Sequence, residues 1–299
     1  MDLNAKIQEL AKEKNALILA HNYQPEEIQA AAHITGDSLE LSRVAADNDA
    51  DIIVFCGVHF MAESASILSP EKKVLLPEPT AGCPMADMAE PEDLIEMKKK
   101  HPDAMVITYI NSSAAIKALS DVICTSSNAV DIVKKVDTRE IIFVPDRNLG
   151  QYAQRFTDKK IILWNGFCPT HEKFTPEQLI EIKTKHPDGL VVVHPECRPE
   201  VIDMADEVFS TGKMVKFVQE TNVKKIIVGT ESDMIVKLRS VAPHIEYIPA
   251  SEHFTCPNMK KITLDKIYNS LLNEEAEITV NNDVREAARK ALDRMLELS

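Results

Sequence analysis

Three of the six cysteines lie in loops of one kind, each followed directly by a proline. They are Cys83, Cys168 and Cys256, spaced 85 and 88 residues apart. Thiolates are soft ligands that suit zinc or an iron–sulfur cluster. The chain has no Cys-x-x-Cys pair, which argues against a structural zinc ribbon. If the three loops converge, three thiolates on a four-iron cluster leave one iron open to bind substrate oxygens as a Lewis acid.

The other three cysteines have different surroundings. Cys56 ends an apolar segment, Cys124 lies within one, and Cys197 follows His-Pro-Glu. Free cysteine is among the most buried residue types, so we expect these three to be inert core residues. The first residues have no basic segment followed by an apolar run, which argues against a secretory signal. We therefore expect a cytoplasmic protein whose cysteines bind metal, catalyse or pack rather than form disulfides.

Polar side chains that can donate or accept protons end three similar apolar segments. The segments cover residues 17–20, 105–108 and 190–193, again about 85 to 88 residues apart. The polar side chains that follow them are His21, Tyr23, Tyr109, Asn111, His194 and Glu196. Around one cavity, Glu196 is the natural general base, and Tyr109 is a candidate acid or a residue that orients a ligand.

Hydroxyl groups recur at matching positions in turns that open helices. They are Ser38, Ser126, Ser210 and Thr211. Each hydroxyl taken singly is explained by capping of free backbone N–H groups. The same helix ends also favour carboxylate or phosphate, because their N–H groups and the helix dipole attract anions. If the three turns face one centre, we expect them to bind a small polyanion.

These landmarks keep one order and nearly one spacing, which indicates three related units. Each unit also has a second apolar strand, at 52–55, 141–144 and 226–228, and a third short strand before its cysteine loop. Short apolar strands that alternate with helical segments predict parallel sheets covered on both faces. Ligands of such folds bind beyond the carboxyl ends of the strands. We predict an α/β fold of three homologous three-layer α/β/α domains, with short parallel sheets in a pseudo-threefold triangular arrangement around a central site.

The predicted boundaries follow the repeat. They are 1–88 for the first repeat with its N-terminal helix, 89–172 for the second, 173–262 for the third and 263–299 for a C-terminal helical extension. Helical spacing of apolar residues predicts helices at 2–14, 263–273 and 283–298, with Asp283 as the N-cap of the last.

Composition and charge exclude several function classes. The 299 residues carry 34 basic and 47 acidic side chains, a formal net charge of −13. This charge argues against nucleic-acid or anionic-membrane binding, and no apolar run has the length of a membrane span. Residues 210–213 lack the upstream glycine and the following hydroxyl of a phosphate-binding loop, and no Gly-x-Gly-x-x-Gly occurs. We therefore expect small-molecule partners, with no nucleic acid and no membrane.

Taken jointly, the motifs resemble those of the quinolinate synthase family over nearly the whole chain. The segments that carry this resemblance are His21-Asn22-Tyr23-Gln24, Gly36-Asp37-Ser38-Leu39, Cys83-Pro84-Met85-Ala86, Tyr109-Ile110-Asn111-Ser112, Pro145 to Gly150, His194-Pro195-Glu196-Cys197, Ser210-Thr211-Gly212, and Cys256 with Met259-Lys260 and Thr263-Leu264. Small departures occur at Lys213 and His59, where the family pattern suggests other residue types. The Cys-x-x-Cys-x-x-Cys segment of some longer members is absent, so no disulfide switch is expected at Cys256.

The resemblance implies an enzyme of de novo NAD biosynthesis. It would condense iminoaspartate with dihydroxyacetone phosphate to give quinolinate, phosphate and two waters. An oxygen-sensitive [4Fe–4S] cluster would be held by Cys83, Cys168 and Cys256, with its open iron acting as a Lewis acid for dehydration. Substrate binding falls to His21, Ser38, Asn111, Ser126, His194, Ser210 and Thr211, and catalysis to Tyr23, Tyr109 and Glu196. A possible partner is an aspartate-oxidising enzyme that supplies iminoaspartate.

Two other functions remain open at this point. The first is another [4Fe–4S] hydro-lyase that acts on a small hydroxy acid, which consumption of dihydroxyacetone phosphate distinguishes. The second is a non-catalytic metal or anion carrier, which predicts reversible binding without product and gives the tyrosines and Glu196 no role.

Overall fold

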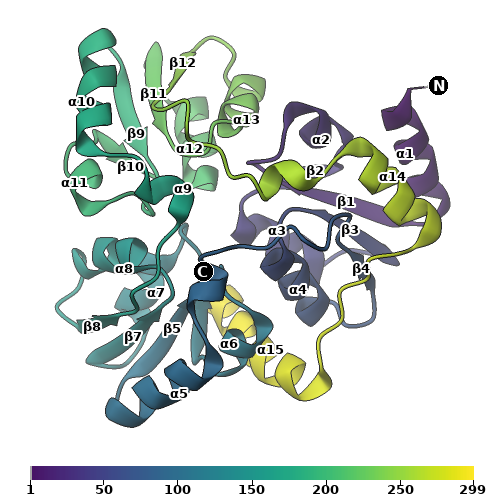
Figure 1. Ribbon diagram of the computed structural model, residues 1–299, viewed down its shortest axis with the longest axis horizontal. Helices are drawn as coiled ribbons and strands as arrows, with labels where there is room; N and C mark the ends of the chain where they lie inside the picture. Colours follow the sequence, from purple (N-terminus) through teal and green to yellow (C-terminus); the bar gives the residue numbers. More distant parts are fainter. Residues whose placement is uncertain (1) are drawn as a thin grey trace.

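Three parallel four-stranded sheets, one from each sequence repeat, form the framework of the protein (Figure 1). The computed structural model describes residues 2–299. The first sheet contains β1 (Ala16–His21), β2 (Ile34–Gly36), β3 (Ile52–Cys56) and β4 (Lys73–Leu75). The second contains β5 (Met105–Tyr109), β6 (Val122–Cys124), β7 (Glu140–Val144) and β8 (Lys160–Leu163). The third contains β9 (Leu190–Val193), β10 (Glu207–Val208), β11 (Lys225–Gly229) and β12 (Glu246–Pro249).

All three sheets have the same strand order, β2-β1-β3-β4, β6-β5-β7-β8 and β10-β9-β11-β12, and all pairs within them are parallel. The three-repeat α/β prediction is therefore confirmed. Figure 1 shows the three units as separate lobes around a common centre. The domain boundaries at 88, 172 and 262 stay a prediction.

Helices connect the strands and cover the sheets. The first unit has α1 (Leu3–Glu13), α2 (Glu26–Ala31), α3 (Ser38–Ala46), α4 (His59–Leu68) and the 3-10 turn η1 (Ala86–Met88). The second has α5 (Pro91–Lys100), α6 (Ala114–Ala118), α7 (Ala129–Lys135), α8 (Arg147–Gln154) and the short α9 (Pro169–Glu172). The third has α10 (Pro176–Lys185), α11 (Pro199–Ile202), α12 (Thr211–Glu220), α13 (Met234–Val241) and the 3-10 turn η2 (Met259–Lys261). The chain ends with α14 (Leu264–Asn273) and α15 (Asn282–Leu298).

The third sheet shows why continuous apolar strands were predicted to be covered on both faces. Val192 packs in a cluster with residues of α12 and α13, whereas its neighbours Val191 and Val193 pack in a second cluster with α10 and α11. Successive side chains of a strand point to opposite faces, so each face needs its own apolar layer. The third unit is therefore a three-layer α/β/α domain.

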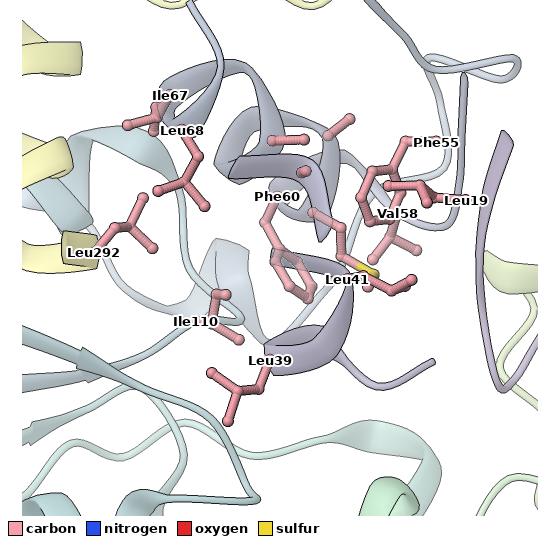
Figure 2. Packing of buried hydrophobic residues seen from close by; sticks show 14 of the residues in the cluster. Leu19, Leu39, Leu41, Phe55, Val58, Phe60, Ile67, Leu68, Ile110 and Leu292 are labelled. Carbon is pink, nitrogen blue, oxygen red and sulfur yellow. The ribbon is translucent and has the colours of Figure 1, made fainter. Parts of the chain in front are cut away.

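The last helix joins the first two units. α14 packs against α1 of the first unit, whereas α15 packs against α6 and β6 of the second unit and against α4 of the first. Figure 2 shows Leu292 of α15 and Ile110 of the second unit close to the α4 residues Phe60, Ile67 and Leu68, all of one buried cluster. The core is therefore continuous across the first and second units.

The predicted helix at 283–298 is present, but the prediction of its N-cap is wrong. The side chain of Asn281, not that of Asp283, caps the helix by accepting from the Asp283 N–H. Within residues 2–299, every helix is too short or too polar to span a lipid bilayer.

Candidate active site

A cavity of about 150 Å³ lies where the three units meet. Of the thirteen residues predicted for the site, all except Ser210 line it. The lining includes the three cysteines of the Cys-Pro loops and the polar residues that follow β1, β5 and β9. The repeat explains this convergence, because each unit contributes one strand end and one cysteine loop to the same centre.

The carboxylate of Glu196 is the centre of the hydrogen-bond network. Its Oε1 accepts from Tyr109 Oη at 2.6 Å, and its Oε2 lies 2.8 Å from His171 Nδ1. His194 Nδ1 lies 3.7 Å from the same oxygen, and its ring stacks on that of His171 with centroids 5.0 Å apart. The Glu196 side chain is only 4% exposed, so these groups rather than water surround its charge.

Thr230 extends this network to the first unit. Its Oγ1 lies 2.9 Å from His171 Nε2 and 2.6 Å from Tyr23 Oη. The His21 ring packs edge-on against Tyr23, with centroids 4.6 Å apart. The two tyrosines predicted to be catalytic therefore meet opposite ends of one chain of polar contacts that passes through His171.

Burial determines which of these groups carry charge. It raises the pKa of Tyr109 and of Tyr23 well above the ordinary value, and the nearby Glu196 charge adds to the effect. It lowers the pKa of His21 to about 4 and that of His194 to about 3. Burial alone would raise the pKa of Glu196, but His171, His194 and the hydrogen bonds from His171 and Tyr109 outweigh it and lower that pKa. At neutral pH, an ionised Glu196 therefore stands near the neutral phenols of Tyr23 and Tyr109 and the neutral imidazoles of His21 and His194.

The hydroxyl turns lie together on another side of the cavity. Ser126 Oγ lies 3.1 Å from His194 Nε2, and Asn22 Nδ2 donates to Thr211 Oγ1 at 3.4 Å. Ser127 donates to Asp37 Oδ2 and lies 2.8 Å from Ser210 Oγ, so one residue of each unit takes part in this contact. The three turns therefore converge, which is the arrangement that the anion-binding interpretation requires.

The capping explanation holds for only one of the three turns. Ser210 caps α12 by accepting from Lys213 N–H, and this hydroxyl is absent from the cavity lining among the described residues. Asp37, not Ser38, caps α3, because its side chain accepts from the N–H groups of Leu39 and Glu40. Ser126 lies before the N-cap position of α7. A carboxylate therefore already occupies the first of the three helix ends that were expected to bind anions.

Several residues of the site were missed by the sequence reasoning. His171, Glu231 and Asp37 all line the cavity. His171 stands three residues after Cys168 on the short helix α9, and Glu231 follows the buried strand β11 closely. Both could have been found from the sequence. Glu231 follows a buried strand, and His171 lies about one helical turn after the predicted ligand Cys168, so each is expected near the end of the strand or the cysteine that it follows. Asn111 Oδ1 is buried without a hydrogen-bond partner in residues 2–299, which suits a donor from a bound ligand.

The three cysteine loops present free thiols to the cavity. Burial raises the pKa of Cys83 to about 12 and also raises the pKa values of Cys168 and Cys256, so the thiols are protonated without a metal. Metal binding replaces these protons. The ligand atoms of Cys168, His171 and Glu196 lie within 4.8 Å of one another, a spacing that suits a single ion. Cys83, Cys168 and Cys256 line the same cavity as free thiols, one from each unit, and thiolates are the usual protein ligands of iron–sulfur clusters, so the chemistry of this donor set fits such a cluster.

The other three cysteines are buried in the cores, as predicted. Cys56, Cys124 and Cys197 are each 0% exposed, and burial raises their pKa values. They belong to apolar clusters rather than to the cavity.

The fold and the site define an α/β protein whose thiol-lined cavity lies between three units of one chain. A family model described as "Quinolinate synthetase A protein" matches residues 5–297. The chain is 53% identical to the quinolinate synthase of Geobacter sp. (strain M21) over 294 residues, which cover 98% of this chain and 97% of the relative. It is 51% identical over 298 residues to that of Caldicellulosiruptor saccharolyticus, covering 99% and 98%, and 53% identical over 294 residues to quinolinate synthase 2 of Methanosarcina acetivorans, covering 98% and 95%. The chain belongs to the quinolinate synthase family.

Proposed function

We propose that the protein condenses iminoaspartate with dihydroxyacetone phosphate and releases quinolinate, phosphate and two waters, as a step of NAD biosynthesis. The observation that carries this proposal is the carboxylate of Glu196, held between Tyr109 and His171 in the same cavity as three free thiols. Ring closure with loss of two waters needs a group that removes protons and groups that protonate leaving hydroxyls. Glu196 and the two neutral tyrosines supply both kinds of group.

Substrate anions would be held by neutral donors in this proposal. Ser38, Ser126 and Thr211 line the cavity, and the imidazoles of His21 and His194 stand beside them. The lowered pKa values of the two histidines leave each ring with one N–H donor and no charge. Ser210 would act through its contact with the Ser127 hydroxyl. The unpartnered Oδ1 of Asn111 would accept a hydrogen bond from the imine or a hydroxyl of the substrates.

Proton transfer would depend on the pair of Glu196 and Tyr109. The ionised carboxylate can accept a proton, and the Tyr109 phenol at 2.6 Å remains protonated at neutral pH and can donate one. Tyr23 would serve a second transfer through the contact of its Oη with Thr230. Burial excludes water from the network, which protects an imine from hydrolysis.

Cys83, Cys168 and Cys256 would hold a [4Fe–4S] cluster with one open iron. When bound, the cluster would supply a Lewis acid for the loss of water from substrate hydroxyls. Each thiol comes from a different unit and precedes a short helical turn, η1, α9 or η2, that fixes the direction of its loop. All six cysteines are free, which fits a reducing compartment, and we place the protein in the cytoplasm on that basis.

Anaerobic purification followed by iron, sulfide and visible-spectrum measurements tests the cluster. We expect about four irons and four sulfides per chain in the wild type, and loss of both in Cys83→Ala, Cys168→Ala and Cys256→Ala. The matched control is Cys56→Ala, the same change at a buried core cysteine, which should keep the iron. A colourless wild type after careful reconstitution would refute the cofactor and favour the carrier function.

Adding both substrates to the iron-loaded protein tests the reaction itself. We expect quinolinate and phosphate to appear in equal amounts as dihydroxyacetone phosphate is consumed. Dehydration of a small hydroxy acid, with no consumption of dihydroxyacetone phosphate, would support the hydro-lyase instead. An aspartate-oxidising enzyme is the proposed source of iminoaspartate, because this imine hydrolyses in water.

A further inference from the structure

One lysine joins three segments that are far apart in the chain. Lys260 Nζ donates to the Tyr23 carbonyl oxygen at 2.6 Å, and it lies 2.7 Å from both Glu231 Oε1 and Asp233 Oδ2. Lys260 stands on η2, four residues after Cys256. Tyr23 follows β1 of the first unit, and the two carboxylates follow β11 of the third. The lysine therefore bridges the first and third units beside the cavity.

Glu231 is the buried member of this group. Its side chain is 0% exposed, and its Oε1 also accepts from the Cys256 N–H at 3.3 Å, while Oε2 accepts from the Asp233 N–H at 2.9 Å. A buried carboxylate is costly unless it is paired and hydrogen-bonded. Lys260 supplies the pairing charge, so the position of the Cys256 backbone depends on the Lys260–Glu231 ion pair.

The loop that carries Tyr23 is held from the same side. Gln29 Nε2 lies 3.1 Å from Asn22 O, 2.8 Å from Gln24 O and 3.2 Å from Asp233 O. Gln29 and Lys260 together therefore donate to the carbonyl oxygens of three consecutive loop residues, 22 to 24. The loop of Tyr23 and the loop of Cys256 are thus attached to the same turn, residues 231–233.

We infer that Glu231 and Lys260 are positioning residues that fix the Cys256 thiol and the Tyr23 phenol relative to each other. The pair contacts these two residues through their backbone, at the Cys256 N–H and the Tyr23 carbonyl oxygen. The two loops are coupled, because displacing either one breaks contacts to the turn that holds the other. This inference rests on the proposed roles of Cys256 and Tyr23.

Alkylation of the metal-free protein by iodoacetamide tests the positioning at each thiol separately. Mass spectrometry gives the rates at Cys256, Cys83 and Cys168 in the same molecules. We expect Glu231→Gln and Lys260→Met to raise the rate at Cys256 about tenfold, as loss of hydrogen bonds to a charged group would, and to change the other two less than twofold. Lys260→Arg, which keeps the charge, should restore most of the protection.

Two further variants separate positioning from general loosening. Lys216→Met makes the same change at an exposed position of α12 and should leave all three rates unchanged. Gln29→Ala removes contacts only from the Tyr23 loop and the 231–233 turn, and it should raise the Cys256 rate about fivefold, through the shared turn.

Equal acceleration of all three thiols in Lys260→Met would mean loss of overall stability and would overturn the inference. An unchanged Cys256 rate in Gln29→Ala would overturn the coupling between the loops. The assay uses no cluster and no substrate, so an absence of iron in the purified wild type would refute the proposed function while leaving this result readable.

Discussion

Replacing Glu196 by glutamine removes the proposed base with little change in shape. The carboxylate accepts two hydrogen bonds, from Tyr109 Oη at 2.6 Å and from His171 Nδ1 at 2.8 Å. A glutamine keeps one acceptor oxygen and presents N–H₂ donors on its other side. If these donors face Tyr109, the phenol oxygen can accept, so the side chain stays in place and the cavity keeps its form.

The expected loss of rate follows because a glutamine amide cannot accept a proton as the carboxylate can. A positioned general base contributes about 10²- to 10⁴-fold to rate, so kcat should fall by at least about 100-fold. The contacts of Glu196 are to protein groups, so substrate binding should change less, with KM altered by less than about tenfold. Iron content should be unchanged, because the three cysteine loops are intact.

Anaerobic turnover with both substrates, read as quinolinate by liquid chromatography, measures the effect. The control is Glu200→Gln, the same change at an exposed position of α11, which should stay within about twofold of the wild type. A Glu196→Gln protein with full iron and a kcat within about threefold of the wild type would sink the assignment of Glu196 as the base.

Three stability predictions follow from the geometry. The lowered pKa values of His21 and His194, about 4 and about 3, mean that the unfolded chain binds more protons below pH 6.5. The free energy of unfolding should therefore fall by about 2 kcal/mol for each histidine between pH 7 and pH 5, measured by urea titration, and His21→Gln should show a smaller fall. At Gly212, an added Cβ would lie 2.4 Å from a carboxylate oxygen of the first unit, so Gly212→Ala should destabilise by about 1 to 2 kcal/mol despite its better helix propensity. Gly82→Ala, where nothing lies within 4 Å of the added Cβ, is the matched control, and equal melting temperatures for these two variants would contradict the argument. Leu292→Ala leaves a cavity in a fully buried site of the shared core and should cost about 3 to 5 kcal/mol by the same titration.

The fold was predictable because the sequence contains three similar units, each with apolar strands, a hydroxyl-rich turn and a Cys-Pro loop in the same order. Strands such as Ile52–Cys56 and Glu140–Val144 are short and apolar throughout, so their burial on two faces could be inferred before any contact was known. The helix at 283–298 was also readable, but its cap was not. Asn281 and Asp283 are both good capping residues, and the backbone path that decides between them depends on how α15 packs on the second unit.

The site was predictable in its members more than in its contacts. The spacing of the Cys-Pro loops and the strand ends identified most of the cavity lining. His171 was missed because no histidine recurs at the matching positions of the other units. Glu231 does match an acidic residue of the second unit, Asp146, 85 residues earlier, and this signal was not used. Ser38 and Asp37 are neighbours, and only the turn geometry shows that the carboxylate takes the capping position while the hydroxyl faces the cavity. Contacts between units depend on docking angles that no local pattern encodes.

The distribution of the three thiols over three units has a consequence for how the enzyme matures. Ligands separated by 85 and 88 residues cannot gather around iron in a short peptide, as ligands spaced Cys-x-x-Cys can. If Cys83, Cys168 and Cys256 hold the cluster as proposed, the polypeptide must complete its folding before iron and sulfide can be delivered. Nascent or truncated chains should then receive no cluster from the cellular machinery that inserts clusters, because only the folded chain brings the three thiols together.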